Sequence, residues 1–366
     1  MKISIITVVL NGADTIERTI SSVINQKVQK DFEIEYIVID GGSSDQTLNI
    51  VNKYIEQIDF FISEYDEGIF DAMNKGIFYS TGDVIGFINS DDWYEDNALE
   101  KVGNRFLKEN CDMVYGNSYH YDKEGNQRYA DVSNRKLEDV RTGMFITHSA
   151  IFAKRKHFRV NGNFDIRYKL AADYNWFLGE LKKNPIVSYI NYPLLHFSDS
   201  GVSSIRICEC LLEAREIALS HCEKTDELTK KQICTSYRNI LIHNENQREV
   251  VQEYLKQELS LVIDVEQEYY LCGAGTRGLR CKRWFEKAGV KIAGFCDKNI
   301  RIQGQVIEGI KVYSYEEIVN KGRGYFIVTS SKYKDEIIKE LQCAGLEDMD
   351  CVFSIDSIEQ GIVETV

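Results

Sequence analysis

The stretch KISIITVVLNGADTIERTISSVINQ (2–26) decides the fold class. Its first part, residues 2–9, is an almost continuous apolar run, which predicts a strand covered on both faces. Residues 14–26 then carry isoleucine and valine at helical spacing on one face. Because the run is short and is followed by Asn11-Gly12 and a polar helix start, we interpret it as a buried strand and not as a signal peptide.

The alternation of strand and helix patterns continues to about residue 200. Residues 33–40 (EIEYIVID) and 83–89 (DVIGFIN) are further apolar runs, each followed by a segment with helical character. Strands that alternate with helices predict an α/β fold with a mainly parallel sheet and helices on both faces. Ligands then bind at the carboxyl ends of the strands.

Three regions are expected along the chain. Residues 1–201 form the first α/β domain. Residues 202–265 form a helical linker, because the chain from 202 to 272 contains no glycine or proline and is rich in Glu, Lys and Leu. Residues 266–366 return to the alternation of strands and helices and form a smaller second α/β domain.

The composition of the 366 residues excludes several classes of protein. With 44 Lys and Arg against 57 Asp and Glu, the net charge is −13, which argues against nonspecific nucleic-acid binding and against electrostatic docking on anionic lipid. No apolar run approaches the roughly 18 residues of a membrane span. The 10 cysteines include no CxxC pair. We therefore expect reduced thiols in the cytosol, with neither a disulfide framework nor a zinc site.

Two acidic motifs directly follow apolar strands. In Asp40-Gly41-Gly42-Ser43-Ser44-Asp45 the glycines allow a close backbone approach, and Asp40 could accept hydrogen bonds from a base or ribose. The alternative is a turn in which Ser44 or Asp45 caps the next helix. In Asn89-Ser90-Asp91-Asp92-Trp93 the adjacent carboxylates repel unless a cation pairs with them, and their oxygens suit Mg²⁺ or Mn²⁺. Here the alternative is a helix N-cap at Asp92 or Asp96.

Two further motifs contain candidate site residues. The segment SEYDEGIFDAMNKG (63–76) places glycines around one short helix, which suggests a close approach to a ligand. Its Asp66, Asp71 and Lys75 could instead form a charge group on the helix surface. Asp173 opens a later apolar-periodic helix, where a carboxylate is either stabilised by the helix dipole or points into a cleft as a general base.

In this order and spacing, the four motifs resemble the family 2 glycosyltransferases, which have a GT-A fold. The resemblance covers about residues 1–200. It is closest to bacterial enzymes that build capsule, O-antigen or colanic-acid-type exopolysaccharides. Their SExDxGIYDAMNKG segment appears here as Ser63 to Gly76, with Phe70 in the place of the tyrosine.

The resemblance implies roles for individual residues. Residues that would bind the nucleotide or donor are Thr7, Val8, Asn11, Asp40, Asp66, Asn74, Lys75 and Asp91. Asp92 and His196 would ligate Mn²⁺ or Mg²⁺, whereas His148, expected in the strand FITHSAIF, and Trp93 would lie near the acceptor or donor sugar. The alternatives are a core position for His148 and a solvated loop for His196. Asp173 would be the general base, although Ala172 replaces the glutamate that commonly precedes it.

The function implied by the resemblance is an inverting, metal-dependent transfer of a hexosyl or N-acetylhexosaminyl group. The donor would be a nucleotide-sugar, with UDP as the expected nucleotide. The acceptor would be a hydroxyl of a glycan or lipid-linked molecule in surface polysaccharide biosynthesis. The expected location is cytoplasmic, with peripheral contact at the inner face of the membrane. A non-catalytic sugar-nucleotide-binding or scaffold protein is the main alternative.

A separate glycine-rich motif, GAGTRG (273–278), follows a strand in the last third of the chain. Gly273, Gly275 and Gly278 together with Asp297 fit the context of a dinucleotide-binding fingerprint. Too few residues follow for a cofactor domain and a substrate domain, which disfavours an NAD(P)-dependent oxidoreductase. The segment resembles the small Rossmann-like domains attached to some sugar-processing enzymes. It would be a second nucleotide site or a packing and homo-oligomerisation module.

Overall fold

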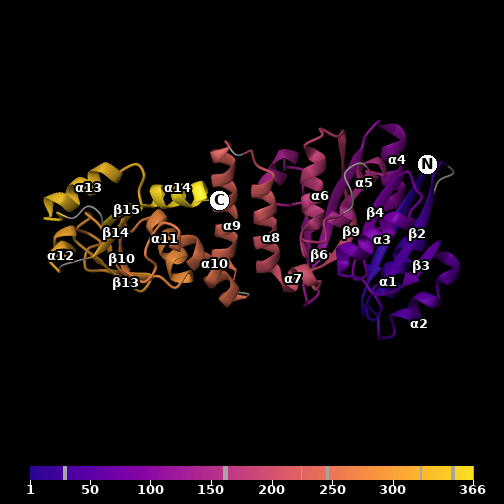
Figure 1. Ribbon diagram of the computed structural model, residues 1–366, viewed down its shortest axis with the longest axis horizontal. Coiled ribbons are helices and arrows are strands. Elements are labelled where there is room, and N and C mark those ends of the chain that lie inside the picture. The colour runs from indigo at the N-terminus through magenta and orange to yellow at the C-terminus, as the bar shows by residue number, and fades with distance from the viewer. Residues whose placement is uncertain are drawn as a thin grey trace. The chain divides into compact units, whose positions relative to one another are not determined.

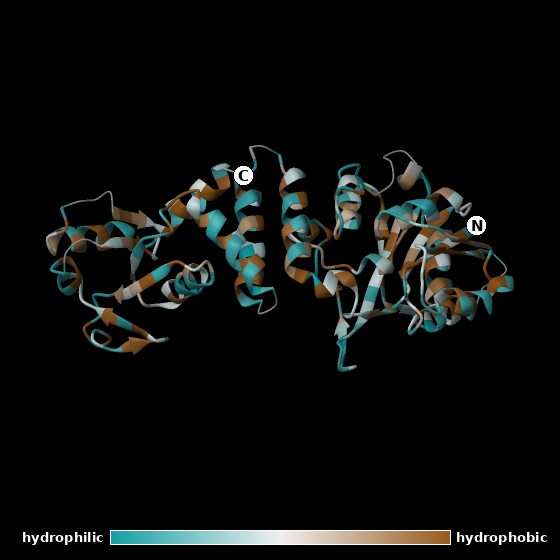
Figure 2. Ribbon diagram, turned by 60° about the horizontal axis from the view of Figure 1, so that its bottom comes forward, coloured by the Kyte–Doolittle hydropathy of each residue, from teal (hydrophilic) through white to brown (hydrophobic). Residues whose placement is uncertain are grey.

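The computed structural model describes residues 1–27, 31–159, 164–223, 225–244, 247–321, 324–347 and 351–365. The chain divides into two compact units, Met1–His221 and Cys222–Val366 (Figure 1). In both units, the helices contain both hydrophilic and hydrophobic residues along their length (Figure 2), as amphipathic helices that cover a sheet do.

The first unit is built on one mixed sheet with the order β3-β2-β1-β4-β8-β6-β9-β5, and β7 pairs with β6. The strands β1 to β4 run parallel, whereas β8 is antiparallel to both β4 and β6. The strand bounds are β1 (Lys2–Val9), β2 (Glu33–Asp40), β3 (Phe60–Ser63), β4 (Val84–Asn89), β5 (Trp93–Tyr94), β6 (Met113–Tyr121), β7 (Gln127–Ala130), β8 (Ile151–Lys154) and β9 (Val187–Ser198).

Helices cover this sheet because their apolar faces pack against its strands. Ile16 and Ile20 of α1 are fully buried with Ile3 and Ile5 of β1 in one core cluster. The helix bounds are α1 (Ile16–Ile24), α2 (Thr47–Asn52), α3 (Ile69–Tyr79), α4 (Ala98–Lys108), α5 (Lys156–Arg159), α6 (Ala172–Leu181), α7 (Val202–Ile205) and α8 (Ile207–Ser220), with 3-10 turns η1 (Ile55–Gln57), η2 (Leu137–Thr142) and η3 (His148–Ala150).

The α/β prediction is confirmed, with two corrections. The sheet is mixed because β8 enters it antiparallel between β4 and β6, whereas β1 to β4 and the pair β6–β9 are parallel. The prediction that His148 lies in a strand is wrong. His148 begins the turn η3, and β8 starts three residues later at Ile151. The turn η3 packs against β4.

The second unit contains a sheet with the order β12-β13-β11-β10-β14-β15, parallel except for the β12–β13 pair. This is the strand order of a doubly wound fold, and it forms because successive crossovers lead outward from β10 in both directions. The bounds are α9 (Glu227–His243), α10 (Arg248–Ser260), β10 (Glu268–Cys272), α11 (Thr276–Lys287), β11 (Lys291–Cys296), β12 (Val306–Ile307), β13 (Ile310–Tyr313), α12 (Tyr315–Val319), β14 (Tyr325–Val328), α13 (Lys334–Cys343), β15 (Val352–Ser354) and α14 (Ile355–Thr365).

Residues 202–265, which were expected to form one helical linker, contain helices that are divided between the two units. Helices α7 and α8 lie in the first unit, and α9 and α10 lie in the second. Among the described residues, no helix has both the length and the apolar character needed to cross a bilayer.

Candidate active site

Asp40 lies at the carboxyl end of β2, and its side chain is fully buried. Its Oδ2 accepts hydrogen bonds from the backbone N–H of Gly42 (3.1 Å) and Ser43 (2.9 Å) and from Ser63 Oγ (2.6 Å). Its Oδ1 has no hydrogen-bond partner among the described residues although it is buried. A buried acceptor without a partner is costly, so this atom suits a donor group on a ligand.

The loops after β1 and β2 are joined through Asn11, which adopts a left-handed conformation with φ of 52°. Its N–H donates to Ser43 Oγ (2.7 Å), and its Oδ1 accepts from the N–H of Ser44 (2.8 Å). Thr7 and Val8 are buried, and the Thr7 hydroxyl lies 3.1 Å from the Tyr36 hydroxyl in the core. Both side chains therefore belong to the buried core.

Asp66 lies directly against the glycine pair that follows Asp40. A Cβ atom on Gly41 would lie 2.3 Å from Asp66 Oδ2, so any larger residue would displace the Asp66 carboxylate from this position. Asp66 Oδ1 accepts a hydrogen bond from the N–H of Gly68 (2.9 Å). Burial raises the pKa of Asp66, and the nearby charge of Asp40 acts in the same direction. The structure thus brings the two predicted nucleotide-binding carboxyl groups together.

Asn74 and Lys75 serve the scaffold in this structure. The Asn74 amide exchanges two hydrogen bonds with the backbone of Phe164, at 2.9 Å and 2.8 Å. Lys75 Nζ donates to the carbonyl oxygen of Tyr65 (2.7 Å) and lies 2.9 Å from Glu64 Oε1. Both side chains therefore hold loops around α3, and the charge of Lys75 also acts on Asp66.

Asp91 and Asp92 follow β4 at the same edge of the sheet. Asp92 is fully buried; its Oδ1 accepts from the N–H of Ser198 (2.9 Å) and its Oδ2 from Ser149 Oγ (3.2 Å). Burial raises the pKa of Asp92 well above its ordinary value, and the charge of Asp91 adds to this shift. Burial also raises the pKa of Asp91. The sheet therefore holds two carboxyl groups whose charges are poorly compensated by the protein.

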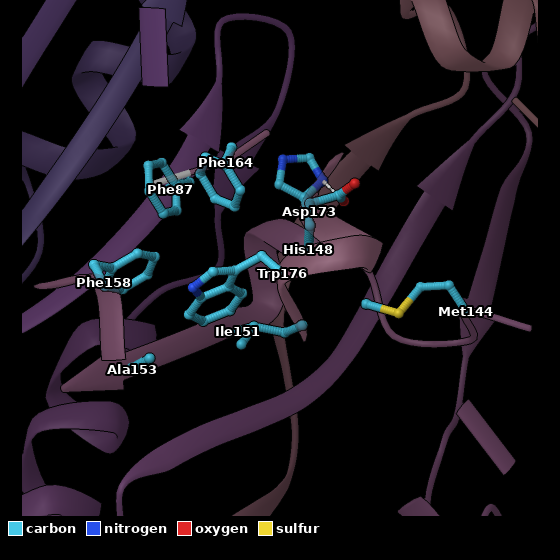
Figure 3. Close-up of a pocket in the computed structure, with 9 residues that line it drawn as sticks. All are labelled: Phe87, Met144, His148, Ile151, Ala153, Phe158, Phe164, Asp173 and Trp176. Carbon is cyan, nitrogen blue, oxygen red and sulfur yellow. Dashed lines mark ion pairs between the residues drawn. The ribbon is translucent and has the colours of Figure 1, made fainter. Parts of the chain in front are cut away.

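His148 connects this pair to the predicted base. Its Nδ1 lies 3.8 Å from Asp173 Oδ2 (Figure 3). Its Nε2 lies 3.3 Å from Ser149 Oγ, which in turn donates to Asp92. Burial raises the pKa of Asp173 and lowers the pKa of His148. The result is a continuous row of polar groups that runs from Asp173 to Asp92.

A small pocket opens beside Asp173 and His148 (Figure 3). One wall is an aromatic cluster in which the Trp176 ring stacks on Phe158 at 4.5 Å between centroids. The other lining residues are hydrophobic: Phe87, Met144, Ile151, Ala153 and Phe164. An apolar cavity with a few polar groups at one end is typical of a small-molecule site.

Trp93 and His196 form a second aromatic cluster. Their rings are 4.7 Å apart and nearly parallel, and the Arg18 guanidinium lies 3.5 Å from the centre of the Trp93 ring. His196 Nδ1 is 3.0 Å from the Tyr121 hydroxyl, and its Nε2 is 3.0 Å from Glu95 Oε2. Both ring nitrogens of His196 are therefore occupied, and in this arrangement neither is open to a metal ion.

The resemblance described above implies that Asp92 and His196 ligate Mn²⁺ or Mg²⁺. Within the described ranges, no group of three or more His, Cys, Asp or Glu side chains is arranged to hold a metal ion. Mg²⁺ is commonly bound by one or two carboxylates together with substrate phosphates. Asp91 and Asp92, whose pKa values are both raised, fit that pattern, with the remaining ligands supplied by a bound diphosphate.

Two residues at the centre of the site were not found from the sequence. Ser149 and Ser198 bind Asp92 from positions 57 and 106 residues further along the chain. For Ser149, the only local signal in the sequence was its position next to His148. The contact of Ser198 is made by its backbone N–H, which carries no sequence signal at all.

In the second unit, the predicted glycine-rich turn connects β10 to α11. Gly273 has a φ of 108°, and a Cβ on Gly278 would lie 1.9 Å from the carbonyl oxygen of Gly273. Gly275 is the N-cap of α11. Asp297 binds the turn, since its Oδ2 accepts from the N–H of Ala274 (3.0 Å) and its Oδ1 from that of Asn299 (2.9 Å). A second nucleotide site here stays a prediction.

Comparison with solved structures supports the fold. S. aureus TarS 1–349 in complex with UDP-GlcNAc aligns with a TM-score of 0.53 at 15% identity, covering 71% of this chain and 81% of that one. The structure of TarS 1–349 without a named ligand gives a TM-score of 0.51 at 16% identity. At such identities the likeness concerns the fold alone.

Sequence comparison identifies the family. A "PGL/p-HBAD biosynthesis glycosyltransferase" of Mycobacterium bovis (strain BCG / Pasteur 1173P2) is 32% identical over 179 residues, which cover 47% of this chain and 67% of that protein. An uncharacterized glycosyltransferase of Mycobacterium tuberculosis (strain ATCC 25618 / H37Rv) is 30% identical over 209 residues, covering 56% and 78%. Residues 268–350 match the family described as "C2185-like, N-terminal", and residues 4–172 match "Glycosyl transferase family 2". The chain therefore belongs to glycosyltransferase family 2.

Proposed function

We propose that the chain transfers a sugar from a UDP-sugar to an acceptor hydroxyl held beside Asp173, with inversion at the anomeric carbon. The observation that carries this proposal is the row of polar groups from Asp173 through His148 and Ser149 to Asp92. It connects a candidate base at one end with a pair of carboxyl groups at the other. A structural neighbour crystallised with UDP-GlcNAc supports the choice of donor.

The nucleotide is proposed to lie over the loops after β1 and β2. The unpartnered Oδ1 of Asp40 would accept a hydrogen bond from a ring N–H of the base, such as that of uracil. Asp66, next to Gly41, lies where it could bind the ribose. The hydrogen bonds of Asn11 with Ser43 and Ser44 preorganise both loops before the ligand arrives.

Asp91 and Asp92 would hold Mn²⁺ or Mg²⁺ against the diphosphate. When bound, a divalent ion offsets the charge that develops on the leaving diphosphate. The protein contributes the fixed orientation of Asp92, which Ser149 and Ser198 hold through both carboxylate oxygens.

In the proposed reaction, the acceptor oxygen bonds to the anomeric carbon as the bond from that carbon to the diphosphate breaks. The proton of the acceptor hydroxyl passes to Asp173 Oδ2. The raised pKa of Asp173 makes its carboxylate a better proton acceptor than an exposed aspartate. A single displacement needs no covalent enzyme intermediate, so one base suffices where a retaining glycosidase needs a nucleophile and an acid.

The acceptor is proposed to present an apolar face next to its reactive hydroxyl, because the pocket beside Asp173 is walled by aromatic and aliphatic side chains. We expect an aryl or octyl glycoside to be a better acceptor than the corresponding free sugar. Replacing Trp176 with leucine removes the aromatic face but keeps an apolar side chain. It should raise the KM for the aryl glycoside roughly tenfold while leaving the donor KM unchanged.

The matched control is Phe78→Ala, which removes an aromatic ring that is 79% exposed on α3 and does not line the pocket. Equal acceptor KM values in Trp176→Leu and wild type would show that the acceptor binds elsewhere.

We further propose that the acceptor is lipid-linked or part of a glycan, and that the reaction belongs to surface polysaccharide assembly at the cytoplasmic face of a membrane.

The proposed donor site is tested by titrating UDP into the protein in the presence of Mn²⁺ and then with EDTA. In Asp40→Asn, the side-chain NH₂ must face the base N–H, because the oxygen is needed by Gly42, Ser43 and Ser63. We expect the Kd for UDP to rise about 10–100-fold, as for loss of a hydrogen bond to a charged group.

Asp96→Asn serves as the control, because Asp96 is exposed in the loop after the acidic pair. Unchanged UDP affinity in Asp40→Asn would refute this placement of the nucleotide. UDP binding without release of UDP from any UDP-sugar, with any acceptor tried, would favour a non-catalytic sugar-nucleotide-binding protein.

A further inference from the structure

A carboxylate from α8 holds the loop that leads into α6. Glu213 Oε1 accepts a hydrogen bond from the N–H of Lys169 (2.7 Å), and its Oε2 accepts from those of Leu170 (2.6 Å) and Ala171 (2.7 Å). Ala171 is the N-cap residue of α6 and has no side chain able to cap the helix. Glu213 thus binds three consecutive N–H groups that lead into α6, the last of them that of the N-cap residue, which lies 42 residues before Glu213 in the chain.

This anchoring bears directly on the proposed base. Asp173 is two residues beyond Ala171, in the first turn of α6. A second contact from α8 fixes the same loop, because Cys210 Sγ lies 3.7 Å from the carbonyl oxygen of Leu170. Both the N–H and the C=O of Leu170 are therefore held by α8. The direction in which the Asp173 carboxylate points depends on this helix start.

We propose that Glu213 is a positioning residue for Asp173, so that α8, from the segment expected to be a linker, completes the active site. The proposal rests on the proposed function, in which Asp173 takes the acceptor proton. Ala172 offers no carboxylate beside the base. Glu213 instead supplies a carboxylate from α8, where it binds the loop before α6.

The charged and titratable groups that face Asp173 come from two elements. His148 of η3 favours the ionised form of Asp173, whereas Glu213 of α8 opposes it and so adds to the effect of burial, which raises the pKa of Asp173. Cys210 of α8 has its pKa raised to about 12, mainly by burial, and is an uncharged thiol at neutral pH. Asp91 acts on His148 from the opposite side. Removing the charge of Glu213 should therefore lower the pKa of Asp173.

Three variants distinguish the effect of the Glu213 charge from the effect of its side-chain length. Glu213→Gln removes the charge and places an NH₂ group opposite at least one backbone N–H of the loop. Glu213→Asp keeps the charge but shortens the side chain by one methylene. Glu216→Gln is the matched control, because Glu216 is exposed on the same helix and no hydrogen bond from it to this loop is seen.

We expect Glu213→Gln to lower kcat about 10–100-fold with the donor KM unchanged, as for misplacement of a catalytic group. The acid limb of its kcat/KM profile should move to lower pH. Glu213→Asp should lose kcat with the acid limb in its original place, and Glu216→Gln should match wild type in both. In hydrogen exchange, the amides of residues 170 and 171 should lose protection in both Glu213 variants.

The outcomes distinguish failure of this inference from failure of the proposed function. Wild-type kcat and undiminished amide protection at residues 170 and 171 in Glu213→Gln, with Asp173→Asn inactive, would overturn the positioning role and leave the proposed function standing. Wild-type turnover in Asp173→Asn would overturn the proposed base and this inference with it. Should Glu213→Gln fail to fold, Glu213→Asp decides the question, since it keeps the charge near the helix start; wild-type kcat in Glu213→Asp would then refute the role.

Discussion

Replacing Asp173 with asparagine is expected to lower kcat by about 10²–10⁴-fold, the usual contribution of a positioned general base. Asparagine has nearly the same shape but cannot accept the acceptor proton. The Kd for UDP should stay the same, because the nucleotide is proposed to bind at Asp40 and Asp66 and not at Asp173. Steady-state kinetics with a UDP-sugar, together with UDP titration, checks both expectations.

The pH dependence gives an independent test of the same residue. Since burial raises the pKa of Asp173, the acid limb of kcat/KM should lie above the ordinary value of about 3.9, with activity falling as pH decreases through it. Asp165→Asn is the control, because Asp165 is bound to Arg167 (2.6 Å) and lines no part of the pocket. An acid limb that persists unchanged in the residual activity of Asp173→Asn would assign the limb to another group.

Replacing Asp92 with asparagine is expected to have opposite effects on activity and stability. Transfer should fall by about 10²–10³-fold, because a carboxylate that helps to stabilise the leaving diphosphate is lost. The first unit should nevertheless become more stable at neutral pH. Asp92 is fully buried beside Asp91, so its ionised form is destabilising, and asparagine removes that charge. Its amide can still accept from the N–H of Ser198 and donate to the Ser149 hydroxyl.

The direction of this stability change follows from the pKa shift. The folded protein binds a proton at Asp92 more tightly than the unfolded chain does. The contribution of Asp92 to the free energy of unfolding is therefore most favourable at low pH, and it is lost as the pH rises through the raised pKa of Asp92 in the folded protein. Thermal unfolding in EDTA should show Tm about 2–4 °C higher for each kcal/mol of repulsion removed. Asp96→Asn, which alters an exposed aspartate, should change neither property. A lower Tm in Asp92→Asn would mean that the carboxylate stabilises the fold.

Much of the fold and part of the site follow from the sequence. Continuous apolar runs such as residues 2–9 and 33–40 must be buried on both faces, so their identity as central strands depends only on local pattern. Because parallel strands end at one edge of their sheet, Asp40 and Asp92 could be placed at a common edge before their contacts were known.

Other parts of the site depend on contacts between distant segments. The side chains of Asn74 and Lys75 look available for a ligand in the sequence, but they bind the backbone of Phe164 and Tyr65. Backbone groups of this kind are identical at every residue, so no pattern in the sequence predicts which of them will meet a given side chain.

The sequence by itself determined the α/β class, the central strands and the acidic groups at their ends, since periodicity and local turn chemistry act over a few residues. Only the tertiary structure decided that β8 runs antiparallel, that η3 turns His148 toward Asp173, and that Glu213 binds the loop that leads into α6. These features depend on which surfaces meet after the chain has folded. That outcome is set by packing and by the need of buried polar groups for partners, and not by neighbours along the chain.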